Sequence, residues 1–397
     1  MIKLPYNTCF GCYGCYNVCP KDAIEIKPDK YGYMHPDIDT TKCIECHLCE
    51  KVCTVYHPQP LNTPREVLAA VNIDESELKS VASGGLCTSL GREIIRRGGV
   101  VYGCYEENYH SIHHVRIDKD EDLDLLKGSK YVHSEIGNVF QLVKQDLEKG
   151  LEVLFIGTPC QVSGLYGYLR KAYENLHTVD MVCHGVPSQK MLCNQIELYY
   201  KPWMDNFKKG LVQFRWKDSS YGIHYGIRFS IDNSTIEQQS EWRSPYMAAF
   251  SYGISYRENC YSCPFACGER VADITAADFW GLGKEVSSQF KDIDGVSMVL
   301  INTEKGHRLF DTVKDHFMIE SHTIEEASRR NANLRHPAPR PDTRDEFLRL
   351  FNERGIKAAS YACVPKYRKM CNPIYRYLIA NKIVTKSYTI VKNILKK

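Results

Sequence analysis

The sequence predicts an α/β protein, in the broad sense that includes α+β folds, with a small cysteine-rich domain at its N-terminus. Two cysteine runs of identical spacing fall within the first 53 residues. Short β-branched apolar runs then alternate with helical stretches, which is typical of α/β domains. With 43% hydrophobic and 25% charged residues, the composition is that of a globular protein with a substantial core.

The composition also indicates a cytoplasmic protein. No run of about 18 apolar residues predicts a transmembrane helix, and the first residues lack the charged and apolar segments of a signal peptide. The 18 cysteines are therefore expected in a reducing compartment, where dense thiols act as metal ligands or redox groups.

The net charge of +3 is unevenly distributed along the chain. Residues 366–397 contain nine Lys or Arg and no Asp or Glu, mixed with apolar residues at roughly helical spacing. Two interpretations stay open, a solvated C-terminal helix or peripheral contact with an anionic membrane face or acidic partner. Nucleic-acid binding is not expected, because the basic block is short and confined to one end.

The two cysteine runs predict two 4Fe–4S clusters. Each has the pattern C-x2-C-x2-C-x3-C, and the second repeats the first after 34 residues. This is the bacterial ferredoxin pattern, in which the fourth cysteine of each run ligates the other cluster, whereas zinc sites use well-separated cysteine pairs. The proline that follows the first run, Pro20, is replaced by Thr54 after the second. The expected ligands are Cys9, Cys12, Cys15 and Cys53 for one cluster, and Cys43, Cys46, Cys49 and Cys19 for the other.

The α/β part follows a Pro-containing linker, residues 55–66. A helix is predicted over 86–97, stopped by two glycines, and strands are predicted over 100–105 and 153–156. After the second strand we expect a loop over 157–161 and then a helix. The expected domains are a ferredoxin-like domain (1–60), two parts of the α/β domain (61–150 and 151–325) and a basic C-terminal extension (326–397).

A third cluster is expected in the α/β domain. Cys160 and Cys183 lie in loops that follow predicted strands, and ligands bind beyond the carboxyl ends of such strands. Cys260 and Cys263 form a C-x2-C pair that completes a set of four, with Cys267 as a possible substitute. A zinc ion, a redox disulfide or plain burial remain alternatives. The remaining cysteines are interpreted as buried and inert: Cys87, Cys104, Cys193, Cys363 and Cys371.

No G-x-G-x-x-G or P-loop motif indicates a usual nucleotide site. Two loops are nevertheless compatible with phosphate binding, "SGGLCTSLG" at a predicted helix N-terminus and "KGSKYVHS" at residues 127–134. Each is also compatible with an ordinary loop.

The motifs together resemble a known family. The cysteine runs, "SGGLCTSL", "GSKYV", "GTPCQVSGL", "CHGVPS" and "CYSCPFACGERVADITAADFWG" are similar to those of the family of coenzyme F-420 hydrogenase/dehydrogenase β subunits, over about residues 1–320. Members include the β subunits of F-420-reducing hydrogenases, proteins of F-420H2 dehydrogenases and 7-hydroxymethyl chlorophyll a reductase. The resemblance implies a flavin domain that binds FAD beside 4Fe–4S clusters.

The resemblance also implies site residues. In "DITAADFWG", Asp273, Thr275, Asp278 and Trp280 match a motif to which we assign no role, and Phe265 fits the family better than Cys267 does. His184 is a candidate proton donor, with hydrogen bonding inside its loop as the alternative. The candidate FAD contacts are Ser83, Gly84, Gly85, Thr88, Ser129, Lys130, Tyr131, Thr158 and Gln161.

The expected function is that of an FAD-dependent iron–sulfur oxidoreductase. Clusters carry single electrons and a flavin exchanges one or two, so a flavin beside clusters couples the two kinds of carrier. Electrons would be exchanged with ferredoxin or another redox protein on one side, and with a deazaflavin or an unidentified organic substrate on the other. The alternatives are a non-catalytic electron-transfer component of a larger complex, or a cluster-stapled interaction protein of a polysaccharide-synthesis assembly.

Overall fold

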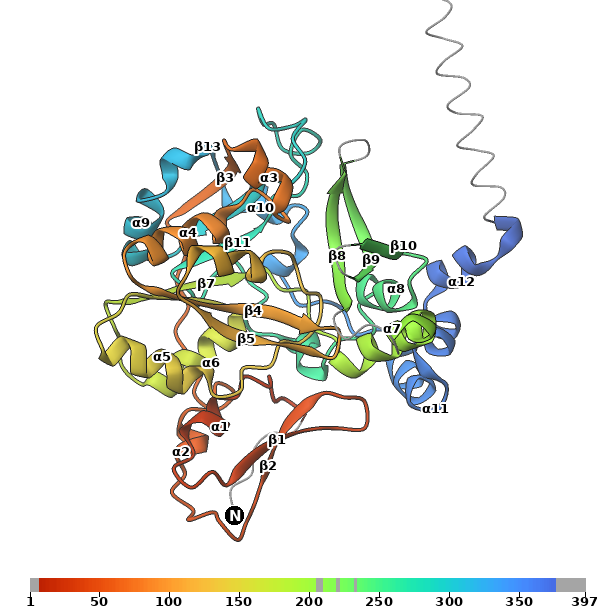
Figure 1. Cartoon of the computed structure of the whole chain (residues 1–397), viewed down its shortest axis with the longest axis horizontal. Helices are drawn as coiled ribbons and strands as arrows, with labels where there is room; N and C mark the ends of the chain where they lie inside the picture. The colour runs from red at the N-terminus through yellow and green to blue at the C-terminus, as the bar shows by residue number, and fades with distance from the viewer. Residues whose placement is uncertain (1–6, 205–209, 219–221, 232–233, 376–397) are drawn as a thin grey trace, which may run out of the picture.

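The computed structural model describes residues 7–204, 210–218, 222–231 and 234–375. Figure 1 shows three parts: a central sheet with helices, a small N-terminal unit below it, and a second lobe beside it. Within the described ranges, no helix is both long and apolar enough to cross a lipid bilayer.

The central sheet has eight strands in the order β13-β3-β12-β11-β7-β6-β4-β5. The pairs β11–β7, β7–β6 and β6–β4 are parallel, and the other pairs are antiparallel. In chain order the strands are β3 (Glu66–Asn72), β4 (Val100–Asn108), β5 (Ser111–Ile117), β6 (Val153–Ile156), β7 (Leu176–Met181), β11 (Ile274–Asp278), β12 (Ser297–Ile301) and β13 (Phe317–His322).

Helices cover both faces of this sheet because its central strands place apolar side chains alternately on one face and on the other. Val153 and Phe155 of β6 pack with α5 (Val139–Glu148) and α6 (Pro159–Leu169). Leu154 points to the opposite face and packs with α4 (Leu86–Arg96) and α9 (Glu304–Asp311). The parallel strands are thus buried on both sides, as parallel sheets require. Short helices complete this part: α3 (Glu75–Ser80), α10 (Ile324–Ser328) and 3-10 turns at Asp120–Leu126, Glu258–Ser262, Lys314–His316 and Ala332–Leu334.

The N-terminal unit contains α1 (Gly14–Val18), α2 (Leu48–Lys51) and the hairpin of β1 (Ile24–Pro28) and β2 (Met34–Ile38). Its helix α1 lies against the α5–α6 face of the central sheet, and α2 packs on α1 (Figure 1). Asn17 donates to the carbonyl of Gly137 at 2.8 Å, and the Thr54 and Ser163 hydroxyls are 2.5 Å apart. The unit is therefore docked on the sheet through buried hydrogen bonds as well as apolar contacts.

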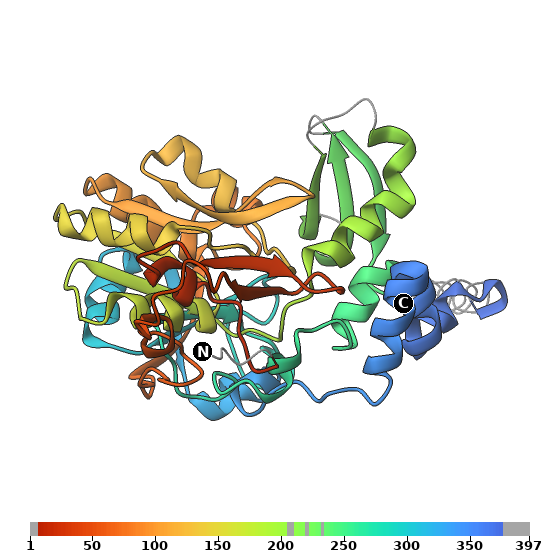
Figure 2. The same ribbon diagram turned by 90° about the horizontal axis from the view of Figure 1, so that it is seen from below.

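The second lobe was not expected from the sequence. It joins a three-stranded antiparallel sheet, ordered β10-β9-β8, to four helices and lies to one side of the central sheet (Figure 2). The Lys190 ammonium at its edge donates to the carbonyl of Lys30 at 2.6 Å, so the tip of the β1–β2 hairpin contacts this lobe too. Its elements are α7 (Gln189–Met204), β8 (Gly210–Asp218), β9 (Gly222–Ile231), β10 (Ser234–Ser240), α8 (Pro245–Ser251), α11 (Arg344–Cys363) and α12 (Pro365–Cys371).

Most predicted local elements are present, with shifted boundaries. The helix predicted over 86–97 ends at Arg96, and the strand predicted over 100–105 continues to Asn108. The loop expected over 157–161 is shorter, because Thr158 and Gln161 form a capping box that begins α6 at Pro159. The basic tail expected to be helical or membrane-associated lies largely outside the described residues, which end at 375.

Candidate functional site

The first predicted set of cysteines is brought together in the N-terminal unit. Burial raises the pKa of the Cys12 thiol, and the nearby Cys9 and Cys53 raise it further. The pKa of Cys15 is also raised, first by burial and then by Cys12, Cys9 and Cys53. Crowded, buried thiols resist ionisation, and a bound metal centre is what converts such thiols to thiolates.

The second predicted set lines a hollow between α2 and the β1–β2 hairpin. Ile24 and Ile38 provide apolar walls beside the thiols, and Cys49 is the most buried of the four. Its pKa is raised to about 11, chiefly by burial. The cysteines that line this hollow are Cys19, Cys43, Cys46 and Cys49.

The repeat of the cysteine pattern is also a repeat of backbone conformation. Gly11 and Tyr13 both have φ of 65°, and the residues 34 positions later, Glu45 and His47, have φ of 52° and 58°. Positive φ is uncommon outside glycine and clusters at functional sites. The Gly11 amide donates to the Cys9 sulfur at 3.3 Å, and the Ala23 amide donates to that of Cys19 at the same distance. Such N–H···S bonds tune cluster potentials.

Among the residues that the structure describes, no three potential ligands converge on a point where a single metal ion would bind. This observation concerns single-ion centres. In a four-iron cube each cysteine ligates a different iron, so its thiols surround the cube rather than meeting at one atom.

The third predicted set gathers at the carboxyl edge of the parallel strands. Cys160 lies in the first turn of α6, directly after β6, and Cys183 follows the adjacent strand β7. The pKa of Cys183 is raised by burial first and then by Cys260, Cys160 and Cys263. The pKa of Cys263 is raised to about 12, again by burial and then by Cys160 and Cys260. Four thiols from three separate segments thus lie close together.

A buried arginine holds two of these segments in place. Arg270 is 1% exposed and pairs with the fully buried Asp180 at 3.1 Å. Its guanidinium donates to the carbonyl of Phe265 at 2.9 Å, two residues after Cys263. It also donates to the carbonyl of Met181 at 3.0 Å, two residues before Cys183. One side chain therefore ties the Cys263 loop to the end of β7.

The motif residues Asp273 and Thr275 stabilise the same edge of the sheet through buried hydrogen bonds. Asp273 accepts from the amide and hydroxyl of Thr178, each at 3.0 Å, and the Thr275 hydroxyl donates to Asp180 at 2.6 Å. Because both acidic residues are buried, these bonds satisfy groups that would otherwise destabilise the sheet. In this structure Asp273 and Thr275 fix the register of β7 and β11.

Cys267 lies apart from the third set. Its sulfur contacts the carbonyls of Pro264 and Glu269 at 3.4 and 3.3 Å, and the charges that act on it come from Glu269, Arg270 and Asp180. The cysteines interpreted as inert are likewise dispersed, and none of the 18 cysteines is in a disulfide.

The first and third sets are neighbours across the docked interface. A Cβ atom added at Gly164 of α6 would lie 2.8 Å from the Cys12 Cβ and 2.9 Å from its sulfur. Phe10 and Phe265, one from each cysteine loop, have ring centroids 5.6 Å apart. Cys160 also acts on the pKa of Cys12. Helix α6 thus carries Cys160 in its first turn and presses its next turn against Cys12.

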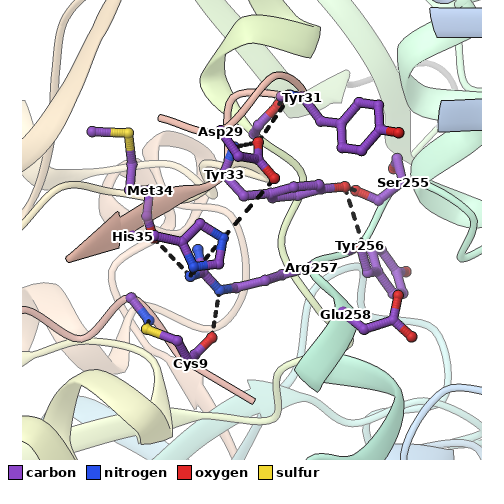
Figure 3. Close-up of polar contacts among 12 residues, drawn as sticks. Cys9, Asp29, Tyr31, Tyr33, Met34, His35, Ser255, Tyr256, Arg257 and Glu258 are labelled. Atoms are coloured by element: carbon purple, nitrogen blue, oxygen red, sulfur yellow. Dashed lines mark hydrogen bonds and ion pairs between the residues drawn. The ribbon is translucent and has the colours of Figure 1, made fainter. Parts of the chain in front are cut away.

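A second buried arginine, Arg257, contacts the N-terminal unit at Cys9, Met34 and His35 (Figure 3). Arg257 is 2% exposed and donates to the carbonyls of Cys9 at 2.6 Å and Met34 at 2.7 Å. Its charge favours the thiolate forms of Cys160 and Cys260, against the effect of burial. No carboxylate forms an ion pair with Arg257 within the described part of the chain.

The expected flavin contacts around the "SGG" loop lie at the same carboxyl edge. Gly84 is packed so tightly that an added Cβ would lie 2.3 Å from the carbonyl oxygen of Ala70. Gly85 has φ of 92° and begins α4, whose first turn contains the buried Thr88. The Ser83 hydroxyl is buried without a hydrogen-bond partner. Glycine is required at the two middle positions, because Gly84 packs against the sheet with its amide donating to the Ser297 hydroxyl at 2.9 Å and Gly85 has a positive φ.

The other expected contacts have local structural partners. Lys130 donates to the carbonyls of Leu126 and Lys127, at 3.0 and 2.7 Å, and Tyr131 stacks on Phe250. Gln161 completes the α6 cap and donates to the carbonyl of Ser134 at 2.9 Å. These bonds give Lys130 and Gln161 a role in the loops themselves.

Two further candidates lie in loops near this edge. Ser129 precedes Lys130 in an irregular segment. His184 directly follows Cys183 and is exposed.

Sequence reasoning missed the arginines of the site. Arg257 precedes Cys260 by three residues and Arg270 follows Cys263 by seven, and both are almost wholly buried. The sequence did contain a signal for these residues, because both arginines flank the C-x2-C pair. A buried cation needs a neighbouring anion, so arginines beside potential thiolates are candidates for the site.

Taken together, two cysteine loops on a docked N-terminal unit and a third cysteine set at the sheet edge define an iron–sulfur electron-transfer protein. Comparison with known proteins agrees. Residues 8–56 match the 4Fe–4S dicluster domain. Residues 150–327 match the C terminus of the β subunits of coenzyme F-420 hydrogenase/dehydrogenase. The two matches together support the family of coenzyme F-420 hydrogenase/dehydrogenase β subunits for this chain.

Individual relatives are similar over different lengths. The F subunit, one of the proteins of the F(420)H(2) dehydrogenase of Methanosarcina mazei, is 20% identical over 329 residues, which cover 80% of this chain and 85% of the relative. A polyferredoxin-like protein of Methanocaldococcus jannaschii is 41% identical over 67 residues, 14% of this chain but only 40% of that protein. A chain of the F-420-reducing nickel–iron hydrogenase complex of Methanosarcina barkeri aligns at 19% identity and a TM-score of 0.45, over 76% of this chain and 92% of that one.

Proposed function

We propose that the chain is an FAD-dependent oxidoreductase that passes electrons between its ferredoxin-type clusters and a flavin, and on to a two-electron organic partner. The observation that carries the proposal is the contact between the two cysteine sets at α6. A Cβ at Gly164 would lie 2.9 Å from the Cys12 sulfur, and Cys160 begins the same helix. Three four-iron clusters would thus form a chain from the N-terminal unit to the sheet edge.

The assignment of ligands follows the cysteine sets. The first cluster would be held by the Cys9 set, the second by the Cys19 set and the third by Cys160, Cys183, Cys260 and Cys263. The second cluster would lie beside Ile44 of the N-terminal unit, which is 57% exposed. That position suits exchange with ferredoxin or another redox protein.

The carboxyl edge of the sheet fits a flavin. The N-terminus of α4, which follows the "SGG" loop, presents the first backbone amides of the helix, and the buried Ser83 hydroxyl beside it lacks a hydrogen-bond partner among the described residues. The third cysteine set borders this edge through Cys183, and His184 beside it is a proton-donor candidate. A bound flavin would supply the exchange between single electrons and an electron pair.

A cysteine substitution tests the electron path. Cys160→Ser should remove one cluster, about four iron atoms, and should stop reduced viologen from reducing the bound flavin. Cys267→Ser is the matched control, because Cys267 lies in the same region but outside the set. Equal iron content and equal flavin reduction in both variants would contradict the proposal.

One finding favours a second function. The name of the relative from Methanosarcina mazei makes that relative one component of a dehydrogenase. The chain would then carry electrons for a larger complex and leave the substrate chemistry to a partner. Protein that contains iron but never flavin, and that reduces no organic acceptor alone, would support this alternative.

A further inference from the structure

A buried arginine on the β8–β9 hairpin faces the sheet edge with half of its guanidinium unused. Arg215 is 6% exposed, and its Nη1 pairs with the carboxylate of Asp278, at the end of β11. Its Nε and Nη2 have no hydrogen-bond partner among the described residues. A buried donor without a partner destabilises the folded state, so such a group needs an explanation.

The alternation of side chains along β8 accounts for the direction of this side chain. Val212 and Phe214 pack in the core of the second lobe. Arg215 and Lys217 occupy the alternate positions, whose side chains point to the opposite face of the strand. Arg215 reaches Asp278 and Lys217 donates to the carbonyl of Ser83 at 2.7 Å, so both cations face the sheet edge.

The two unused nitrogens form the side of the guanidinium that binds oxyanions in a bidentate manner. The same pair is occupied in Arg96, whose Nε and Nη2 donate to the two oxygens of Glu93 at 2.7 and 2.8 Å. A carboxylate or phosphate satisfies both donors at once. In Arg215 the equivalent side is open and buried.

Other unpartnered groups and two aromatic rings surround this guanidinium. The guanidinium carbon of Arg215, Cζ, lies 5.2 Å from the ring centroid of Tyr225 and 6.0 Å from the ring centroid of Trp280. The Tyr225 hydroxyl and the Oδ1 atom of Asp278 are also buried without partners. Trp280 is 37% exposed, so the cluster extends to the surface.

We propose that Arg215, supported by Lys217, binds a carboxylate or phosphate group of an organic ligand at the sheet edge, with Tyr225 and Trp280 against its planar part. The inference rests on the proposed function, because that ligand would be either the flavin, through its phosphates, or an acidic two-electron substrate. Asp278 keeps the guanidinium oriented through Nη1, while its negative charge opposes that of the ligand.

The test is calorimetric titration of the anaerobically purified protein with pyrophosphate and with fumarate at constant ionic strength. The wild type should bind at least one probe saturably, and Arg215→Gln should weaken that binding at least tenfold. Arg228→Gln is the matched control, since Arg228 lies on the same hairpin and stacks on Trp216 instead. Asp278→Asn should strengthen binding, because it removes the opposing negative charge; a purely structural role would weaken binding in both variants.

Three controls keep the test decisive. Circular dichroism and iron content report folding, and Arg215→Lys retains the charge if Arg215→Gln does not fold; it should still bind more weakly than the wild type. Prior saturation with FAD identifies the source of the anion: pyrophosphate binding is blocked if the flavin phosphates occupy the site, and retained if an acidic substrate does. Absence of saturable binding to wild-type protein freed of flavin, or equal binding by all variants, would overturn the inference even if the clusters are present.

Discussion

The contact between α6 and the first cysteine loop gives the sharpest prediction about the electron path. In Gly164→Ala the new Cβ would lie 2.8 Å from the Cys12 Cβ and 2.9 Å from its sulfur. Carbon atoms pack at about 3.5–4.0 Å, so α6 and Cys12 must separate by roughly 0.7 Å or more. Ligand constellations tolerate about 0.5 Å of displacement, and we therefore expect the first cluster to be lost or labile.

The energetic cost alone is modest. Alanine is favoured over glycine in a helix by about 1 kcal/mol, whereas overpacking costs about 1–3 kcal/mol, which leaves a net loss of about 1 kcal/mol. Iron content should therefore fall far more than thermal stability does.

A glycine on the other side of the same contact is the control. An alanine Cβ at Gly14 would lie 3.5 Å from the Gly164 oxygen and 3.8 Å from the Cys12 sulfur, which are ordinary contact distances. Gly14→Ala should keep full iron, measured together with acid-labile sulfide and the absorbance of the clusters. Full iron in Gly164→Ala, or equal loss in both variants, would refute the reasoning.

Two further predictions concern buried charges. Arg257→Gln removes a cation beside the first and third cysteine sets. At an effective dielectric of about 20, one charge at roughly 8 Å is worth about 2 kcal/mol, so the midpoint potentials of the clusters in these two sets should fall by on the order of 100 mV. EPR-monitored titration measures the shift, with the cluster of the Cys19 set as unshifted reference, and equal shifts in all clusters would contradict the prediction. Burial raises the pKa of Glu106 from 4.5 to about 7, although the Val212 amide and Lys130 oppose that shift. The folded state then holds the proton more tightly than the unfolded state. The contribution of Glu106 to the free energy of unfolding is therefore fully present below about pH 4.5 and is lost, by about 3 kcal/mol, as the pH rises through 7. Glu106→Gln should flatten this loss in unfolding measured between pH 5 and 8, and an unchanged dependence of the unfolding free energy on pH would contradict the assignment.

The sequence was sufficient for features that depend on local pattern. The two cysteine runs predicted the N-terminal unit, and glycine and β-branched patterns predicted α4 and β6. Cys160 and Cys183 were expected to be neighbours because parallel strands end at one edge, and β6 and β7 are indeed paired.

The features that were missed depend on contacts between distant segments. Arg215 of the β8–β9 hairpin pairs with Asp278, 63 residues later in the chain. Arg257 reaches the carbonyl of Cys9 across 248 residues. Single polar residues in such positions look like surface charges in the sequence, because nothing local reveals that they are buried.

The central claim is that three clusters and one flavin form a continuous path in one chain. Quantification of iron, acid-labile sulfide and flavin in anaerobically purified protein tests it most directly. Three four-iron clusters and one FAD predict about 12 iron atoms and one flavin per chain. About 8 iron atoms would contradict the third cluster, and full iron without flavin would contradict the flavin.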